Sequence, residues 1–261
     1  MPYSVTLSKA VDFGSLLAGS GVPGFLPQSA DGLAEVQGDG RKDREVERVQ
    51  HGEIASQEIL RGFSDAFCAS EQQQMDIRLH DCLLAANQHL ANYITDYPEC
   101  QGMGGTLIAA AFSGQHLHWL SVGDSPLWLI RDGRLERLNQ DHSKKAELQQ
   151  LVAAGLMHAD EIAVHPQRNQ LTSAVMGSAI DFIDINSIAL LHDDIIVMAS
   201  DGVESMPESE LAALCHRVRH TDLQTLAEHI ISYVDSLQKP YQDNATVMVL
   251  KFTQRVVEQQ E

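Results

Sequence analysis

Two segments in the first half of the chain carry apolar residues at the spacing of an amphipathic helix. Residues 51–67 place four apolar side chains at intervals of five, four and four, and residues 75–94 place eight at intervals of one, three or four. Such intervals put the apolar side chains on one face of a helix. Pro98 then ends the pattern, because proline cannot continue a helix. The sequence therefore predicts two helices, each with one apolar face.

Short apolar runs, rich in β-branched and aromatic residues, follow from residue 106 onward. They predict strands at 106–113, 116–123, 126–130, 134–138, 194–200 and 245–252. The Asp132-Gly133 pair between two of these runs is a strong hairpin signal. Two further helices are predicted at 207–218 and 222–238. Strands joined by tight turns, together with clustered helices, indicate an α+β layered domain.

Two regions lack a clear periodicity. In the first 50 residues, Pro23, Pro27 and several glycines interrupt any pattern. The charged stretch 39–48 that follows is typical of a solvated loop or an insertion. The region 141–177 is mixed and more polar. We expect residues 1–261 to form a single domain, with 1–50 as its divergent part.

Composition and charge exclude several classes of protein. The 261 residues include 36 acidic and 18 basic side chains, for a net charge of −18. This balance argues against binding to nucleic acid and against docking on an anionic membrane, because both need a basic face. The sequence has no apolar run long enough to span a bilayer, and we expect no secretory signal, because its first residues lack a basic region followed by a long apolar one. The four cysteines form no CxxC pair, so we expect a cytoplasmic protein with buried free thiols.

Three acidic turns lie at the ends of predicted strands. Asp124 follows the strand 116–123, Asp201 follows 194–200, and Asp243 with Asn244 precedes 245–252. Carboxylates held at the rim of a sheet are the oxygen ligands that Mg²⁺ and Mn²⁺ prefer. Each turn alone is weak evidence, because Asp-Gly and Asp-Asn are common turn residues. Their order and their flanking residues carry more information.

Nine short motifs in a fixed order resemble the metal-dependent serine/threonine protein phosphatases of the PPM, or type 2C, family. They are 102–106 (GMGGT), 122–125 (VGDS), 129–135 (LIRDGRL), 141–143 (DHS), 165–166 (HP), 168–172 (RNQLT), 176–177 (MG), 199–203 (ASDGV) and 243–247 (DNATV). The resemblance covers about residues 102–252. It implies a four-layer αββα sandwich of two antiparallel sheets flanked by helices. It also implies a bacterial signalling hydrolase that removes phosphate from phosphoserine and phosphothreonine by a metal-activated water.

The resemblance also implies roles for single residues. Asp201 and Asp243 are expected as ligands of two Mn²⁺ or Mg²⁺ ions, and Asp124 is expected to hold a third, weaker ion together with Asp201. The stretch 143–171 is expected to be a variable flap beside the cleft, or more simply a surface loop with a short helix. His142 and His165 lie in family-like segments, but we expect them to be structural. The implied partners are a phosphoprotein substrate and a cognate kinase or regulatory protein.

The N-terminal third departs from the family pattern, which has a metal-bridging aspartate in an Asp-Gly-Met-Gly-Gly motif about eight residues before a Gly-Glu-x-Ala-Ser segment. Residues 52–56 (GEIAS) match that segment. Asp31 and Asp39 are each followed by glycine but lie 21 and 13 residues before Gly52. Asp43 lies nine residues before Gly52 but is followed by arginine. Asp39 is preferred, because it keeps the dipeptide and follows the strand-like run 33–37 (LAEVQ).

The phosphate-binding arginine of the family is also missing, since no arginine precedes Arg41. Arg41, Arg44, Arg48 and Arg61 are the remaining candidates, and Pro126 stands where the family often has arginine. Without a bridging ligand, Asp201 and Asp243 could still hold one divalent ion, but the attacking water would lose activation.

Two other readings of the sequence stay open. The first is a pseudophosphatase of the same fold that binds a phosphoprotein or partner without hydrolysing it. The second is a hydrolase with an N-terminal nucleophile, which would need an internal cut, for example before Thr106, because Met1-Pro2 offers no nucleophile.

Overall fold

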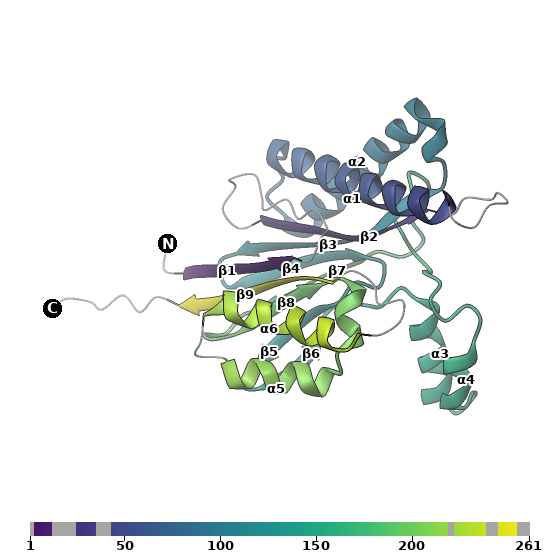
Figure 1. Cartoon of the computed structure of the whole chain (residues 1–261). Helices are drawn as coiled ribbons and strands as arrows, with labels where there is room; N and C mark the ends of the chain where they lie inside the picture. The colour runs from purple at the N-terminus through teal and green to yellow at the C-terminus, as the bar shows by residue number, and fades with distance from the viewer. Residues whose placement is uncertain (1–2, 12–24, 35–42, 219–221, 239–244, 255–261) are drawn as a thin grey trace.

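The computed structural model describes residues 3–11, 25–34, 43–218, 222–238 and 245–254. Its strands form two antiparallel sheets that face each other (Figure 1). The first sheet has the order β1 (Tyr3–Val11), β9 (Thr246–Gln254), β8 (Ile195–Ala199), β5 (Leu127–Arg131) and β6 (Arg134–Arg137). The second has the order β2 (Phe25–Ala34), β3 (Met103–Ser113), β4 (His116–Val122) and β7 (Asp184–Ala189).

Helices cover the outer face of each sheet (Figure 1). α1 (Asp43–Ala69) and α2 (Met75–Asp96) lie on the β2–β3–β4–β7 sheet, and the short helix η1 (Pro98–Cys100) follows them. α5 (Glu208–Val218) and α6 (Leu223–Ser236) lie on the other sheet. The predicted α+β sandwich of four layers is therefore confirmed. α3 (Lys144–Ala153) and α4 (Ala159–Val164) project from the sandwich, and η2 (Asp201–Ser205) follows β8.

Three apolar clusters fill the spaces between these layers, and one strand supplies two of them. In β3, Leu107 and Ala109 belong to the cluster under α1 and α2, whereas Ile108 and Ala110 belong to the cluster between the sheets. Alternate side chains of a strand point to opposite faces. Because both faces of β3 are covered, its residues 107–112 are all apolar, as the sequence pattern suggested.

The hairpin predicted at Asp132-Gly133 is confirmed. Asp132 has φ +52° and Gly133 has φ +75°, and the turn joins the paired strands β5 and β6. Two central residues with positive φ are typical of a type I′ turn, whose twist matches that of the flanking strands. The four predicted helices and the strands from residue 106 onward are also present, although α1 begins earlier and β3 starts at Met103.

The structure corrects several expectations. The charged stretch 39–48 is not a loop from Asp43 onward, because α1 begins there, and the residues that follow lack a helix breaker until Gly52. β1, β2 and β7 were missed. β2 contains Pro27, which an edge strand tolerates because one side of its backbone needs no partner. Of the four free thiols, Cys68 is exposed rather than buried.

No helix within the described ranges is long and apolar enough to cross a membrane.

Candidate active site

Asp124 and Asp201 leave neighbouring sheets at one end of the sandwich. Asp124 lies just after β4, and Asp201 opens η2 just after β8. Burial raises the pKa of Asp124 to about 7, and the negative charges of Asp201, Asp141 and Glu204 contribute to this rise because they lie close to it. Carboxylates that repel one another in this way are stabilised by a bound cation. The chemistry of this donor set therefore fits a hard divalent ion.

A tight turn fixes the position of Asp124. Gly123 has φ +105°, and a Cβ at this position would lie 2.6 Å from Cβ of Thr106. Its backbone N–H donates to Nδ1 of His142 at 3.2 Å, and the hydroxyl groups of Thr106 and Ser125 lie 2.8 Å apart. Only glycine combines this backbone conformation with such a close approach. The predicted structural role of His142 fits this contact, and burial lowers the pKa of its imidazole.

The start of β9 is tied to the loop that carries Asp201. The backbone N–H of Ser200 donates to the carbonyl oxygen of Thr246 at 3.0 Å, and the N–H of Thr246 donates to Oγ of Ser200 at 2.9 Å. Asp243 lies outside the described residues, three positions before Thr246. Within the described part of the chain, no three acidic, histidine or cysteine side chains form a complete metal site.

β2 carries Asp31 to the same end of the sandwich. In its pairing with β3, Ala30 lies opposite Thr106 and Gly32 lies opposite Gly105, so Asp31 is the extra residue of a β-bulge. Bulges of this kind redirect a residue and are frequent next to active sites. Thr106 is also the residue against which the Gly123 turn packs. The backbone of Asp31 therefore lies close to the turn that presents Asp124.

The other two candidates for the bridging aspartate are placed differently. Asp39 lies outside the described residues, and Asp43 is the first residue of α1. Asp39 was preferred because it keeps the Asp-Gly dipeptide and follows the strand-like run 33–37, but Asp31 shares that dipeptide and lies within the described strand β2. The spacing argument against Asp31 also weakens, because residues 43–51 belong to the helix that leads into the GEIAS segment.

Two cations that sequence reasoning missed lie beside the aspartates. Arg137, the last residue of β6, donates to Oε1 of Glu204 at 2.8 Å and also to the backbone carbonyl oxygen of Asp124. Its Nη1 lies 3.4 Å from Oδ2 of Asp141. Lys145, on α3, donates to the other oxygen of Glu204 at 2.9 Å. No local pattern marks these two residues, because β6 and α3 carry them to Glu204 on a third element, η2.

Of the four arginines proposed as phosphate ligands, Arg61 is the one whose side chain the structure describes. Arg61 is exposed on α1, and Arg44 and Arg48 belong to the first turns of the same helix. Arg41 lies outside the described residues. Among the described residues, Arg137 and Lys145 are the cations that bind Glu204 beside the aspartates.

The stretch 143–171 contains two short helices instead of the single one expected. α3 begins at an N-cap serine, Ser143, whose Oγ accepts from the N–H of Ala146 at 3.3 Å. The segment returns to its starting point, because the N–H of Lys144 donates to the carbonyl oxygen of Gln170 at 2.8 Å. His165 ends α4, and its Nδ1 accepts from the N–H of Gln167 at 3.2 Å, which agrees with the structural role predicted for it.

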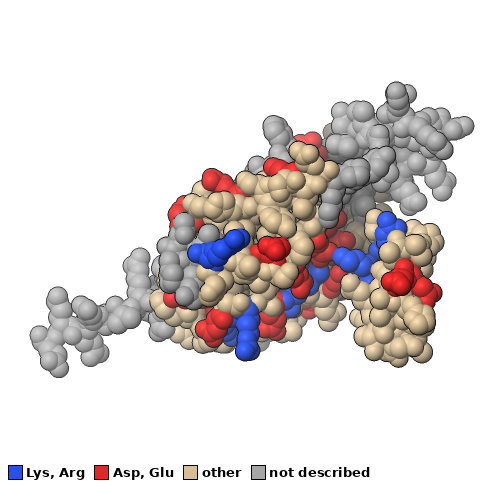
Figure 2. All heavy atoms as spheres, turned by 60° about the horizontal axis from the view of Figure 1, so that its bottom comes forward, with Lys and Arg blue, Asp and Glu red and all other residues tan. Residues whose placement is uncertain are grey.

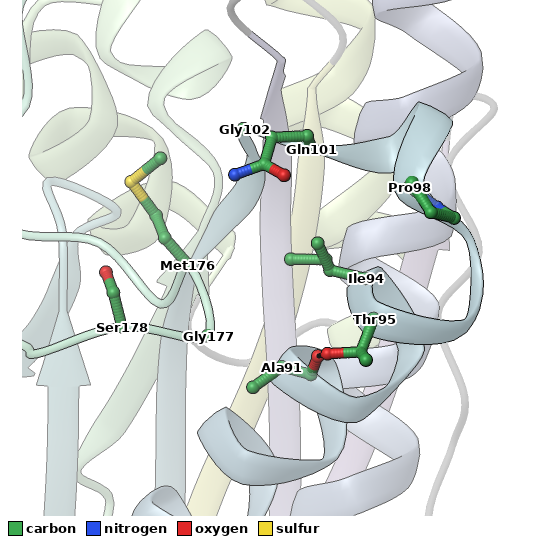
Figure 3. A pocket seen from close by; sticks show the side chains of 9 residues that line it. All are labelled: Ala91, Ile94, Thr95, Pro98, Gln101, Gly102, Met176, Gly177 and Ser178. Atoms are coloured by element: carbon green, nitrogen blue, oxygen red, sulfur yellow. Dashed lines mark hydrogen bonds between the residues drawn. The ribbon is translucent and has the colours of Figure 1, made fainter.

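A pocket of about 460 Å³ lies beside this end, between the last turns of α2 and the segment 176–178 (Figure 3). Ile94, Pro98 and Met176 contribute apolar lining, and Thr95, Gln101 and Ser178 contribute polar groups. It contains no carboxylate, so it is distinct from the acidic cluster. Asn87 fixes its rim by accepting from the N–H of Gly177 at 2.8 Å and donating to the carbonyl oxygen of Ser178 at 2.7 Å.

Comparison with known proteins places this arrangement in context. The family model described as protein phosphatase 2C matches residues 28–162, slightly more than half of the chain. The serine/threonine phosphatase Stp of Listeria welshimeri is 26% identical over 205 residues, which cover 77% of this chain and 79% of Stp. The serine/threonine protein phosphatase PstP of Mycobacterium tuberculosis is 26% identical over 198 residues, which cover 76% of this chain and 37% of PstP.

A solved structure shares the fold. The catalytic domain of PstP in complex with two manganese ions superposes with a TM-score of 0.73 at 21% identity, and the match covers 96% of this chain and 99% of that domain. The hydrolase with an N-terminal nucleophile loses its support, because Thr106 lies inside β3 with its hydroxyl group against Ser125.

Proposed function

The chain belongs to the protein phosphatase 2C family, and we propose that it hydrolyses phosphoserine and phosphothreonine in proteins with Mn²⁺ or Mg²⁺ as cofactor. The observation that carries the proposal is the convergence of Asp124 and Asp201 at one end of the sandwich, where burial and then the charge of Asp201 raise the pKa of Asp124. Bound divalent ions supply a water of lowered pKa and stabilise the charge that develops during phosphoryl transfer.

We assign the metal ligands to the aspartates at this end. Asp201 and Asp243 would hold the principal ions, and Asp124 with Asp201 would hold a weaker one. We now place Asp31 ahead of Asp39 as the bridging ligand. The register of β2 against β3 supports this choice, because it puts the bulge at Asp31 opposite the segment that packs on the Gly123 turn.

The protein's own side chains shape the rest of the site. Arg137 holds the carbonyl oxygen of Asp124 and the carboxylate of Glu204, so it ties the two aspartate turns together. His142 orients the Gly123 turn through its ring nitrogen. These contacts keep the carboxylates in one arrangement, and such preorganisation is the main contribution of a protein to phosphoryl transfer.

The substrates are phosphoproteins. A segment with basic residues around the phosphorylated side chain would suit the net charge of −18. A cognate kinase, a regulatory partner, a cytoplasmic location and a single domain over residues 1–261 stay part of this proposal.

The test is phosphate release from a phosphothreonine peptide in the presence of Mn²⁺ or EDTA. We expect release that needs Mn²⁺ and is lost in Asp201→Asn. We expect Asp31→Asn to lower kcat at saturating Mn²⁺ by at least ~100-fold, because the nucleophilic water loses its activation. Asp39→Asn is the matched control and should keep most of the activity.

Other outcomes would contradict the proposal in defined ways. If Asp39→Asn is inactive and Asp31→Asn is active, the assignment of the bridging ligand is wrong. If the folded wild-type protein releases no phosphate above Asp201→Asn, the chain is a pseudophosphatase, and binding of the same peptide would then be measured.

A further inference from the structure

The segment 144–164, which we call the lobe, makes few buried contacts with the sandwich, which we call the body. Leu148 is the buried residue of α3, and α4 has none. Figure 1 shows α3 and α4 standing clear of the sandwich. Backbone contacts at its base join Lys144 to Gln170 and Ser143 to Leu171. An element with so few buried contacts takes its position from the interactions near its base.

One ion pair of the described residues crosses from the lobe to the body. Nζ of Lys145 donates to Oε2 of Glu204 at 2.9 Å. Oε1 of Glu204 accepts from Nη1 of Arg137 at 2.8 Å, so both carboxylate oxygens are occupied. The side chain of Glu204 is 21% exposed and that of Lys145 is 44% exposed. Figure 2 shows basic and acidic side chains gathered where the lobe meets the body.

The body side of this ion pair belongs to the active site. Glu204 lies in η2, three residues after Asp201. Arg137 binds Glu204 and also the carbonyl oxygen of Asp124. A displacement of Lys145 therefore changes the lobe without removing a contact of either aspartate, since Arg137 still holds Glu204.

We propose that the ion pair between Lys145 and Glu204 is a latch that fixes the lobe beside the acidic end of the sandwich and thereby sets the affinity for a phosphorylated polypeptide. The proposal rests on the phosphatase activity proposed above. A small aryl phosphate needs only the carboxylate end, whereas a polypeptide continues past that end and meets the lobe. Lys145 is accordingly a positioning residue and takes no part in the chemistry.

The neighbouring lysine provides a matched control. Lys144 lies on the same helix, but its Nζ binds Glu147 in that helix at 2.6 Å. Lys145→Gln and Lys144→Gln remove the same charge from the same element, but only the first removes the latch. Lys145→Arg keeps a cation of similar reach. Burial lowers the pKa of Lys145, but the charge and hydrogen bond of Glu204 outweigh it and leave the pKa raised, so the latch stays ionised at neutral pH.

The experiment measures KM and kcat of the Mn²⁺-loaded, full-length protein for a phosphothreonine peptide and for p-nitrophenyl phosphate. Hydrogen exchange of residues 144–164 is followed in the same variants. We expect Lys145→Gln to raise KM for the peptide about two- to fivefold, the range for a partly exposed ion pair. The rate of hydrogen exchange in the lobe should rise in Lys145→Gln, while kcat and KM for p-nitrophenyl phosphate stay unchanged. Lys144→Gln and Lys145→Arg should resemble the wild type in every measurement.

Three results would overturn the proposal. One is equal exchange in Lys145→Gln and Lys144→Gln, which means that there is no latch. Another is faster exchange with an unchanged peptide KM, which means that the lobe does not touch the substrate. The third is an equal fall in kcat/KM for the peptide and for p-nitrophenyl phosphate, which means that Lys145 acts on the chemistry. If the wild type hydrolyses neither substrate, the proposed function fails, and the exchange comparison still decides the latch.

Discussion

Replacing Asp124 by asparagine tests whether the acidic cluster is built for a cation. In the metal-free protein the pKa of Asp124 lies near 7, against 3.8 for a free side chain, because of burial and the negative charges of Asp201, Asp141 and Glu204. Between pH 3.8 and about pH 7, Asp124 keeps its proton in the folded protein and loses it in the unfolded chain. The free energy of unfolding therefore falls as pH rises from about 4 to about 7, and above that range the loss is complete.

The magnitude follows from the size of the shift. A pKa raised by about three units corresponds to a change of at most ~4 kcal/mol in the free energy of unfolding. Partial exposure of Asp124 reduces the expected change to ~2 kcal/mol. Asparagine carries no charge, so Asp124→Asn should unfold less easily than the wild type at pH 8 and about equally at pH 4. Mn²⁺ should stabilise the wild type at pH 8 and stabilise the variant less, because it has lost a ligand.

The assay is urea unfolding of the EDTA-treated protein at pH 4, 6 and 8, with and without Mn²⁺. Asp132→Asn is the control, since Asp132 lies exposed in the β5–β6 turn, where asparagine accepts the same positive φ. If Asp124→Asn and Asp132→Asn show the same pH dependence, the acidic cluster does not repel itself, and its reading as a cation site is refuted.

Two further substitutions test the turn that carries Asp124 and an ion pair at the opposite end of the sandwich. Gly123→Ala should destabilise the fold by ~2–4 kcal/mol in urea unfolding, because it places a Cβ against Thr106 at a positive φ; a loss below ~1 kcal/mol would show that the turn can relax. Arg131→Met should cost ~3 kcal/mol, because the buried Asp194 carboxylate loses its partner at 2.6 Å. Adding Asp194→Asn to Arg131→Met should restore part of that loss, and no recovery would contradict the ion-pair explanation.

Local pattern was sufficient for much of the fold. The apolar stripe of α2 and the Asp132-Gly133 turn were predicted because their physical causes, helical periodicity and a tolerance for positive φ, act within a few residues. The buried strands β3 and β8 were predicted because each faces an apolar layer on both sides. The order of the motifs along the chain also indicated the family.

The sheet edges and the assembly of the site depended on the tertiary structure. β1 has an unremarkable sequence and becomes a strand by pairing with β9 at the other end of the chain. β2 carries Pro27 and is specified by its pairing with β3. Strand propensity depends strongly on the neighbouring strand, so elements of this kind leave a weak local signal.

Distance along the sequence was a poor guide to distance in space at the active site. Asp31 lies 21 residues before Gly52, but residues 43–51 of that interval belong to α1, and the register of β2 puts the backbone of Asp31 beside Thr106. Arg137, Lys145 and Glu204 could not be linked by any pattern, since they meet only when β6, α3 and η2 pack together. The sequence by itself determined which side chains could bind a metal and the elements that carry most of them. The pairing of distant strands decided which of those side chains meet, because electrostatic and hydrogen-bond interactions act over a few ångströms of space and not along the chain.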